Sequence, residues 1–168
     1  FAPAPSKTDI INIPGLGVAG EGISFGAKIL FEALNMPGFM LGIDICEDLW
    51  MPVPPSCYHV MASATVIANL SASDETTGKN NYRKELVSSQ SARLVCGYIY
   101  ADAGEGESST DLVFSGHNII AENGIVLAES ERFNNQMVIS EIDLGRLASE
   151  RRRITTFNIK SPAESGYM

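Results

Sequence analysis

The chain has 168 residues, of which 45% are apolar and 19% are charged, and this composition predicts one folded domain with a substantial core. The net charge of −8 disfavours nucleic acid and anionic membranes as partners and is typical of a protein that handles small molecules. No apolar run approaches the length of a membrane span, and the first eight residues lack the basic region of a signal peptide. We therefore expect a cytoplasmic protein with no nucleic-acid or membrane partner.

Apolar runs and turn signals predict an alternation of strands and helices along the chain. Strands are predicted where apolar and β-branched residues run together, at 26–32, 39–45, 65–70, 97–101, 112–122, 125–130 and 136–142. Helices are predicted at 56–62, 81–95 and 144–153. The Asn123-Gly124 pair between two apolar runs predicts a hairpin, and strand 65–70 is expected to be parallel to its neighbours. This order predicts a mixed α/β fold with a buried sheet.

Cys46 directly follows the apolar run 39–45 and precedes the acidic residues Glu47 and Asp48. A thiol at the end of a buried strand, followed by a sharp turn, is held by the strand and lies beside free backbone N–H groups. This placement indicates a nucleophile, although inert packing is the more common role of a cysteine in an apolar stretch. Cys57 and Cys96 are interpreted as structural. Three widely spaced cysteines disfavour a zinc site or a disulfide framework.

Two histidines and one polar loop are further candidates for chemistry. A dyad of Cys46 with His59 or His117 stays open, but a predicted helix and a predicted strand give both histidines simpler packing or surface roles. The polar loop 71–75 follows a parallel-type strand, where α/β folds place ligands, and turn capping explains it equally well. The glycine spacing at 15–20 matches a dinucleotide motif but lacks the strand and helix around it, so it is interpreted as chance.

Helix 81–95 and the residues before it carry charge and aromatic groups. Tyr82, Leu86 and either Ala92 or Val95 are expected near one face of this helix. Lys79 and Arg83 could hold a carboxylate or pair with the acidic residues of the polar loop, and a solvated ion pair is the simpler interpretation.

Five segments together resemble a known family: GIDICEDLWMPVPP (42–55), ANLSAS (68–73), YRKELVSSQSAR (82–93), EGESSTDLVFSGH (105–117) and AENG (121–124). The first resembles the nucleophile segment of the nitrilase superfamily of carbon–nitrogen hydrolases. As a set, the segments resemble the glutaminase domains of glutamine-dependent NAD synthetases. The resemblance covers nearly the whole chain and is weakest at its two ends.

The resemblance implies a nitrilase-like α-β-β-α sandwich that hydrolyses glutamine through a Glu–Lys–Cys triad and a thioester. Ammonia then passes to a synthetase domain, which uses ATP and Mg to convert deamido-NAD to NAD. Carried onto this sequence, Cys46 is the nucleophile. Glu47 supplies an oxyanion-hole N–H and a carboxylate for the substrate's ammonium. Ser73 and Lys79 contact glutamine, and Trp50 walls the pocket.

This sequence departs from the family at the other two triad positions. The family's general-base Glu and its Lys precede the nucleophile, yet no residue before Cys46 matches them, and Lys28 and Glu32 stand in the wrong setting. Residues 1–168 are therefore expected to be the later part of a glutaminase domain and inactive alone. An incomplete sandwich would expose apolar surface and sheet edges.

The expected partners and the competing interpretations follow from this departure. No cofactor is expected in this chain, since ATP and Mg belong to the synthetase domain. Expected partners are glutamine, the earlier part of the domain, the synthetase domain and further copies of the chain in a homo-oligomer. Two alternatives stay open, namely another amidase or nitrilase of the superfamily and a non-catalytic assembly module.

Overall fold

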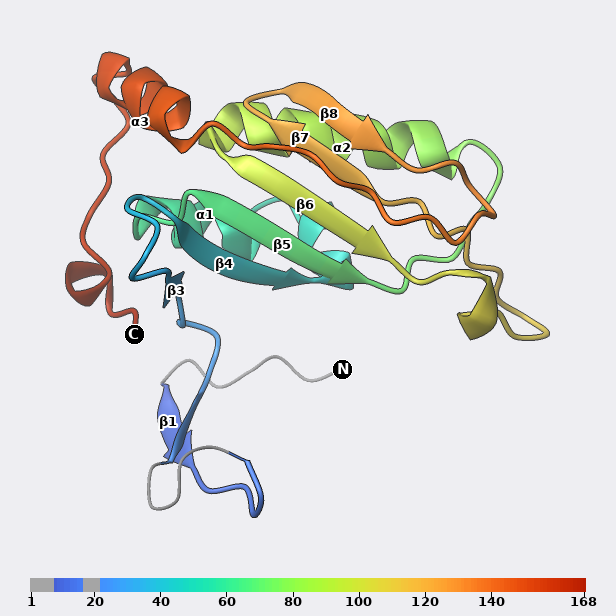
Figure 1. Ribbon diagram of the computed structural model, residues 1–168, viewed down its shortest axis with the longest axis horizontal. Helices are drawn as coiled ribbons and strands as arrows, with labels where there is room; N and C mark the ends of the chain where they lie inside the picture. Colours follow the sequence, from blue (N-terminus) through green and yellow to red (C-terminus); the bar gives the residue numbers. More distant parts are fainter. Residues whose placement is uncertain (1–7, 17–21) are drawn as a thin grey trace.

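The computed structural model describes residues 8–16 and 22–168, and its main feature is a six-stranded mixed sheet (Figure 1). Its strands, in spatial order, are β3 (Phe31–Glu32), β4 (Met40–Ile45), β5 (Val66–Ser71), β6 (Gly97–Asp102), β7 (Ile119–Glu122) and β8 (Ile125–Glu129). The central strands β4, β5 and β6 are parallel, and the outer strands pair antiparallel. The predicted α/β layout, its parallel strand and the Asn-Gly hairpin are confirmed. The expected proline-containing start at 1–7 and residues 17–21 of the glycine-rich loop lie outside the described residues.

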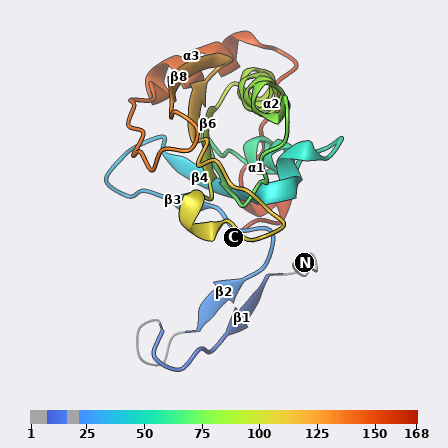
Figure 2. The same ribbon diagram turned by 90° about the vertical axis from the view of Figure 1, so that its right-hand side faces the viewer.

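In the part of the chain that the structure describes, three α-helices accompany the sheet: α1 (Pro55–Met61), α2 (Lys79–Leu94) and α3 (Leu144–Arg153). Helices α1 and α2 lie on the same side of the sheet (Figure 2). Helix α3 lies at the end where β5 and β6 begin, because Arg151 donates hydrogen bonds to the carbonyls of Ala64 and Val95 at 2.8 and 2.9 Å. All three helices were predicted within two residues. No helix in the described part of the chain has the length and apolar character needed to cross a membrane.

Short 3₁₀ turns and one small hairpin complete the described secondary structure. The turns are η1 (Cys46–Trp50), η2 (Glu105–Glu107) and η3 (Ala163–Ser165). Strands β1 (Asp9–Ile11) and β2 (Ile23–Phe25) pair with each other and stand apart from the main sheet in Figures 1 and 2.

Three predicted strands differ from the structure. The run 26–32 forms only the two residues of β3, and the run 112–122 becomes a strand only from Ile119 onward, apart from an isolated bridge between Phe114 and Asp74. Before Ile119, side chains take over the backbone bonds, as where Ser108 Oγ accepts from the N–H of Phe114 at 3.1 Å. The run 136–142 is irregular, with Met137 and Ile139 largely exposed. Alternating apolar residues need a neighbouring strand to pair with, and no strand of the described residues forms a backbone ladder with this segment.

The buried face of α2 also differs from the prediction. Tyr82 is 54% exposed, and the stripe that faces the sheet consists of Arg83, Val87, Gln90, Ser91 and Leu94. Its spacing is helical, but three of the five side chains are polar, which hides the stripe from a hydrophobicity pattern. Arg83 can be buried because carboxylates meet it there.

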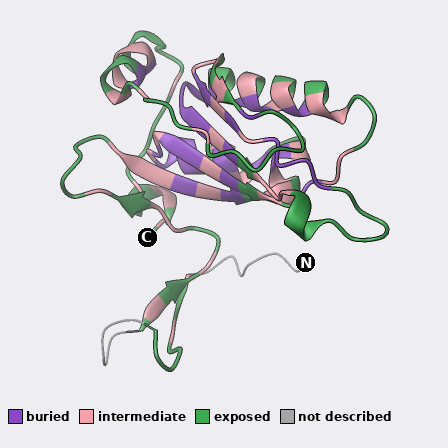
Figure 3. Ribbon diagram, turned by 45° about the vertical axis from the view of Figure 1, so that its right-hand side comes forward, coloured by how far each residue is buried: buried purple, intermediate pink, exposed green. Residues whose placement is uncertain are grey.

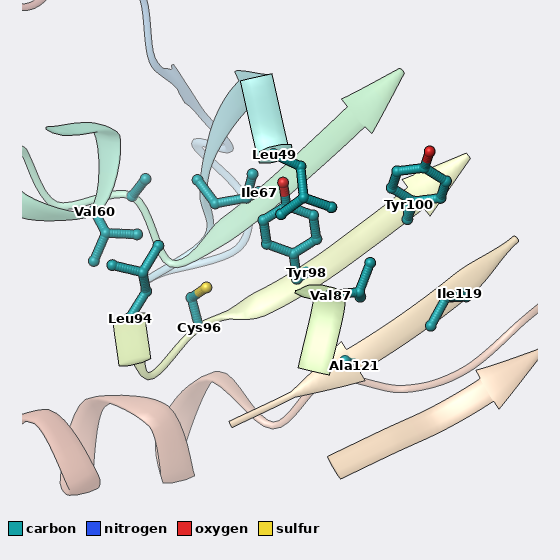
Figure 4. Packing of buried hydrophobic residues seen from close by; sticks show 11 residues of the cluster. Leu49, Val60, Ile67, Val87, Leu94, Cys96, Tyr98, Tyr100, Ile119 and Ala121 are labelled. Carbon is teal, nitrogen blue, oxygen red and sulfur yellow. The ribbon is translucent and has the colours of Figure 1, made fainter. Parts of the chain in front are cut away.

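The core lies between the sheet and helices α1 and α2 (Figures 3 and 4). Figure 4 shows Tyr98 and Tyr100 of β6 with Val87 of α2 and Ile119 of β7. The opposite face of the sheet is apolar but accessible, with Ile45 48% and Leu70 52% exposed. The expected exposure of apolar surface is therefore confirmed.

Candidate functional site

Cys46 lies where strand β4 ends and the 3₁₀ turn η1 begins, as the sequence predicted. Its backbone is left-handed, with φ of 47°. A non-glycine residue in this region costs on the order of 1–3 kcal/mol and persists only where its surroundings impose it. The turn is closed by the N–H of Ile45, which donates to Asp48 Oδ2 at 2.7 Å. The thiol is half-buried and in no disulfide, so the strand end presents it to an incoming molecule.

The residue after Cys46 lies in the first part of the turn η1. Glu47 is the second residue of η1 and is exposed. The first N–H groups of a helical turn have no acceptor within the turn, so they are free to bind an anion. The expected role of Glu47 in binding the oxyanion stays a prediction.

The structure brings two of the predicted binding residues together. The Lys79 ammonium lies 5.4 Å from the centre of the Trp50 ring, within the range of a cation–π contact. Tyr82 stands beside the same indole, with ring centres 5.4 Å apart. Lys79 Nζ also donates to Asp74 Oδ1 at 2.6 Å, and this hydrogen bond lowers the pKa of Asp74. Trp50, from the turn that carries the thiol, is therefore in contact with Lys79 at the start of α2.

Ser73 is buried in the loop between β5 and α2 and is fixed on both sides. Its N–H donates to Asp102 Oδ1 at 2.9 Å, and its hydroxyl oxygen accepts from Arg83 Nη2 at 3.4 Å. Asp102 lies at the end of β6, next to the end of β5 in the parallel register. Ser73 is thus held at the carboxyl ends of the parallel strands, in the loop for which the sequence left a ligand site and a turn cap equally open.

Arg83 is fully buried and joins several acidic groups, so the predicted solvated ion pair is wrong for this residue. Its Nη1 lies 2.9 Å from Glu75 Oε2 and 3.0 Å from His117 Nδ1. Burial alone would raise the pKa of Glu75, but hydrogen bonds from Ser115 and Arg83 hold that pKa below its ordinary value. The sequence predicted that Arg83 pairs with an acidic residue of the polar loop, but it did not predict that this pair is buried.

Both histidines bind partners other than Cys46. His59 Nε2 lies 3.1 Å from the Ile43 carbonyl, and His117, in a loop rather than the expected strand, lies 2.8 Å from Glu129 Oε1. The hydrogen bond that Cys46 makes with a side chain of the described residues runs through its carbonyl and not its sulfur. Neither histidine therefore supports a Cys–His dyad.

Lys28 and Glu32 do not supply the two triad members. Glu32 pairs with Met40 at the opposite end of β4 from Cys46, roughly 20 Å away at 3.3 Å per residue. The Lys28 carbonyl accepts from the N–H of Met168, which places this residue beside the end of the chain.

Sequence reasoning missed three buried polar residues beneath Cys46: Asp44, Asn69 and Tyr98. The carboxylate of Asp44 accepts from the Tyr98 hydroxyl at 3.1 Å. Burial raises the pKa of Asp44 to about 6. The sequence did carry a signal for two of them. Asp44 in β4 and Asn69 in β5 are polar residues at inward-facing positions of otherwise apolar strands.

A surface groove lies away from Cys46, and the described residues form no metal-binding group. A surface groove of about 590 Å³ runs along α2 toward the β7–β8 turn, with Lys84, Ser88 and Gly124 among its lining residues, and Cys46 does not line it. Within residues 8–16 and 22–168, no three His, Cys, Asp or Glu side chains gather in a metal-binding group.

The model of one protein family, described as carbon-nitrogen hydrolase, matches residues 6–152. The chain belongs to this family. It has a nitrilase-like α/β fold, and the described residues hold a mixed sheet flanked by helices. A nitrilase-superfamily protein from Saccharomyces cerevisiae shares this fold with a TM-score of 0.60 at 19% identity, over 70% of this chain and 42% of that one.

More narrowly, the chain is similar to glutamine-dependent NAD(+) synthetases. The Mycobacterium tuberculosis synthetase is 47% identical over 160 residues, which cover 94% of this chain and 23% of the relative. The human one is 28% identical, over 76% of this chain and 18% of the relative. A crystal structure of the Cytophaga hutchinsonii synthetase matches with a TM-score of 0.63 at 26% identity, over 83% of this chain and 20% of that one. The chain spans about a quarter of the length of the mycobacterial synthetases that it matches.

Proposed function

We propose that this chain is the nucleophile-bearing part of a glutaminase domain, in which Cys46 attacks the side-chain amide of glutamine. The observation that carries the proposal is the strained, left-handed Cys46 at the end of a parallel strand. The 47% identity to a protein named glutamine-dependent NAD(+) synthetase supports the choice of glutamine.

The reaction needs a deprotonated thiol and a site for negative charge. The Cys46 sulfur bonds to the amide carbon, and the carbonyl oxygen becomes an oxyanion that accepts from the N–H of Glu47. Collapse of this intermediate, with a proton delivered to nitrogen, releases ammonia and leaves a thioester. Water then attacks the thioester, which frees glutamate and restores the thiol.

The charged ends of glutamine match the residues around Cys46. Lys79 serves the α-carboxylate, since its ammonium has three donors and Asp74 takes one. The exposed carboxylate of Glu47 serves the α-ammonium. The hydroxyl of Ser73 adds a hydrogen bond, and the Trp50 ring closes the pocket against water.

The proton transfers require a base that the described residues do not bring to Cys46. In the proposal, the Glu and Lys of the triad belong to the earlier part of the glutaminase domain, so the 168-residue chain hydrolyses glutamine slowly or not at all by itself. In the complete protein, the ammonia serves a synthetase domain that uses ATP and Mg to make NAD from deamido-NAD. That domain, the earlier part of the glutaminase domain and further copies of the chain are the proposed partners.

One observation favours a second candidate, a non-catalytic assembly module. Ile45 and Leu70 expose about half of their surface on a sheet face that no helix covers in the described residues. Exposed apolar surface of this kind is typical of a face that another segment or subunit covers. This candidate predicts binding without any selective reactivity at Cys46.

Labelling with 6-diazo-5-oxo-L-norleucine, an electrophile shaped like glutamine, distinguishes the two functions. Intact mass first shows whether the purified protein is the 18.1 kDa chain or larger. If it is larger, we expect the reagent to label Cys46 selectively, glutamine to prevent the labelling and Cys46→Ser to abolish it. At 18.1 kDa we expect Cys46 to react no faster than Cys57. A larger protein in which Cys46 is not labelled selectively would contradict the glutaminase proposal.

A further inference from the structure

Three buried polar residues form a hydrogen-bonded network directly beneath the nucleophile. Asn69 Nδ2 lies 3.3 Å from the Cys46 carbonyl and 3.5 Å from the Tyr98 hydroxyl oxygen. The Tyr98 hydroxyl reaches Asp44 Oδ2 at 3.1 Å. Asp44, Asn69 and Tyr98 are fully buried. Figure 4 shows the Tyr98 hydroxyl directed toward the end of the sheet where Leu49 of η1 lies.

We propose that Asn69 is a positioning residue that holds the Cys46 backbone in its left-handed conformation, and that Tyr98 transmits the charge of Asp44 to this contact. The inference rests on the proposed function, since positioning matters because Cys46 is the nucleophile. The reaction described above uses none of these three side chains.

The direction of each hydrogen bond follows from the groups themselves. A backbone carbonyl can only accept, so the Asn69 amide nitrogen faces Cys46. The other side of the amide agrees, because Asn69 Oδ1 accepts from the Ser71 hydroxyl at 2.7 Å. The second amide hydrogen goes to the Tyr98 oxygen, and the Tyr98 hydroxyl donates to Asp44. An ionised Asp44 polarises that hydroxyl and makes its oxygen a better acceptor for Asn69.

The charge of Asp44 is the part of this hydrogen-bonded network that changes with pH. Burial raises its pKa to about 6, so its ionisation changes near neutral pH. The other titratable groups that face it are His59 of α1, Asp48 of η1, Tyr98 of β6, Cys96 and Tyr167.

Most of these neighbours stay in one charge state near neutral pH. Burial raises the pKa values of Cys96 and Tyr167 to about 12 and the pKa of Tyr98 as well, so all three remain protonated. Burial lowers the pKa of His59, whose Nε2 lies 3.6 Å from Asp44 Oδ1. The test must therefore separate Asp44 from His59.

The NMR signal of the Cys46 carbonyl reports directly on this hydrogen-bonded network, because the carbonyl accepts its last hydrogen bond. We would follow its ¹³C signal in the 168-residue protein between pH 4.5 and 8, in the wild type and in Tyr98→Phe, Asp44→Asn and Asn69→Leu. Tyr100→Phe is the matched control, because it removes a buried hydroxyl from the same strand that makes no hydrogen bond to Asp44, Asn69 or Tyr98.

We expect the wild-type signal to titrate with a midpoint of about 6, the pKa of Asp44. Tyr98→Phe and Asp44→Asn should abolish this titration, and Tyr100→Phe should keep it. Asn69→Leu should move the signal upfield, because the carbonyl loses its donor. If Asn69→Leu does not fold, Tyr98→Phe decides.

Three results would overturn the inference: a signal independent of pH, a titration that survives Tyr98→Phe, or one that survives Asp44→Asn and so belongs to His59. This readout does not depend on catalysis. If Cys46 of the larger protein is not labelled selectively while the NMR result is as expected, the glutaminase proposal alone is refuted. Selective labelling with a carbonyl that does not titrate would refute the inference alone.

Discussion

Replacement of Arg83 by methionine tests the buried charge cluster that holds the Ser73 loop. Arg83 is fully buried, 2.9 Å from Glu75 Oε2 and 3.8 Å from Asp102 Oδ2. Methionine keeps most of the side-chain volume but removes the charge. Two buried carboxylates then lose the cation between them, and an uncompensated buried charge costs about 3–5 kcal/mol.

The remaining contacts place the expected loss near the lower end of this range. Ser115 still donates to Glu75 at 2.7 Å, and Arg132 reaches the same carboxylate at 3.4 Å. We therefore expect Arg83→Met to lower the free energy of unfolding by about 3 kcal/mol at pH 7.5. With a typical urea dependence of about 2 kcal/mol per molar, the midpoint falls by about 1.5 M.

Urea unfolding, followed by the fluorescence of the single tryptophan, measures this loss. Lys84→Met is the matched control, because it removes a neighbouring positive charge from the same helix. The Lys84 side chain is 45% exposed, and its ion pair with Glu129 contributes less than about 1 kcal/mol. The difference between wild type and Arg83→Met should shrink as the pH falls toward 4. Arg83 keeps the pKa of Glu75 low, so that stabilisation is present above the unfolded pKa and is lost on protonation. Equal losses in the two variants, or a loss that does not change with pH, would refute the reasoning.

Two further stability predictions concern strand β4. Burial raises the pKa of Asp44 from 3.8 to about 6, so its contribution to stability is complete below pH 3.8 and is lost as the pH rises through about 6. A shift of roughly 2 pKa units corresponds to about 3 kcal/mol. Asp44→Asn should therefore gain about that much relative to wild type between pH 4 and pH 7.5 in urea unfolding, and a constant difference would contradict the burial argument. Gly42→Ala should destabilise by about 1–3 kcal/mol, because the added methyl would lie 2.9 Å from His59 Cβ and 3.0 Å from Ile67 Cδ1. An unchanged midpoint for Gly42→Ala would show that α1 shifts freely.

Local patterns in the sequence determined the elements and the place of the thiol. The apolar run before Cys46 forms β4, the proline cluster ends at the start of α1, and Asn123-Gly124 makes the predicted hairpin turn. These features depend on residues close in the chain, so a single sequence carries them. The family resemblance assigned roles to Glu47, Trp50, Ser73 and Lys79, and the contact between Trp50 and Lys79 is consistent with a common pocket.

Only the tertiary structure decided what surrounds the thiol. Arg83 is buried because Glu75, Asp102 and His117 reach it from different elements, and no pattern within α2 reveals them. The strand predicted at 136–142 failed for the same kind of reason, since a strand needs a neighbour that lies elsewhere in the chain. The contacts beneath Cys46 join residues 23 to 54 positions apart. Such pairs form only when parallel strands align, so the sheet register sets the environment of the nucleophile.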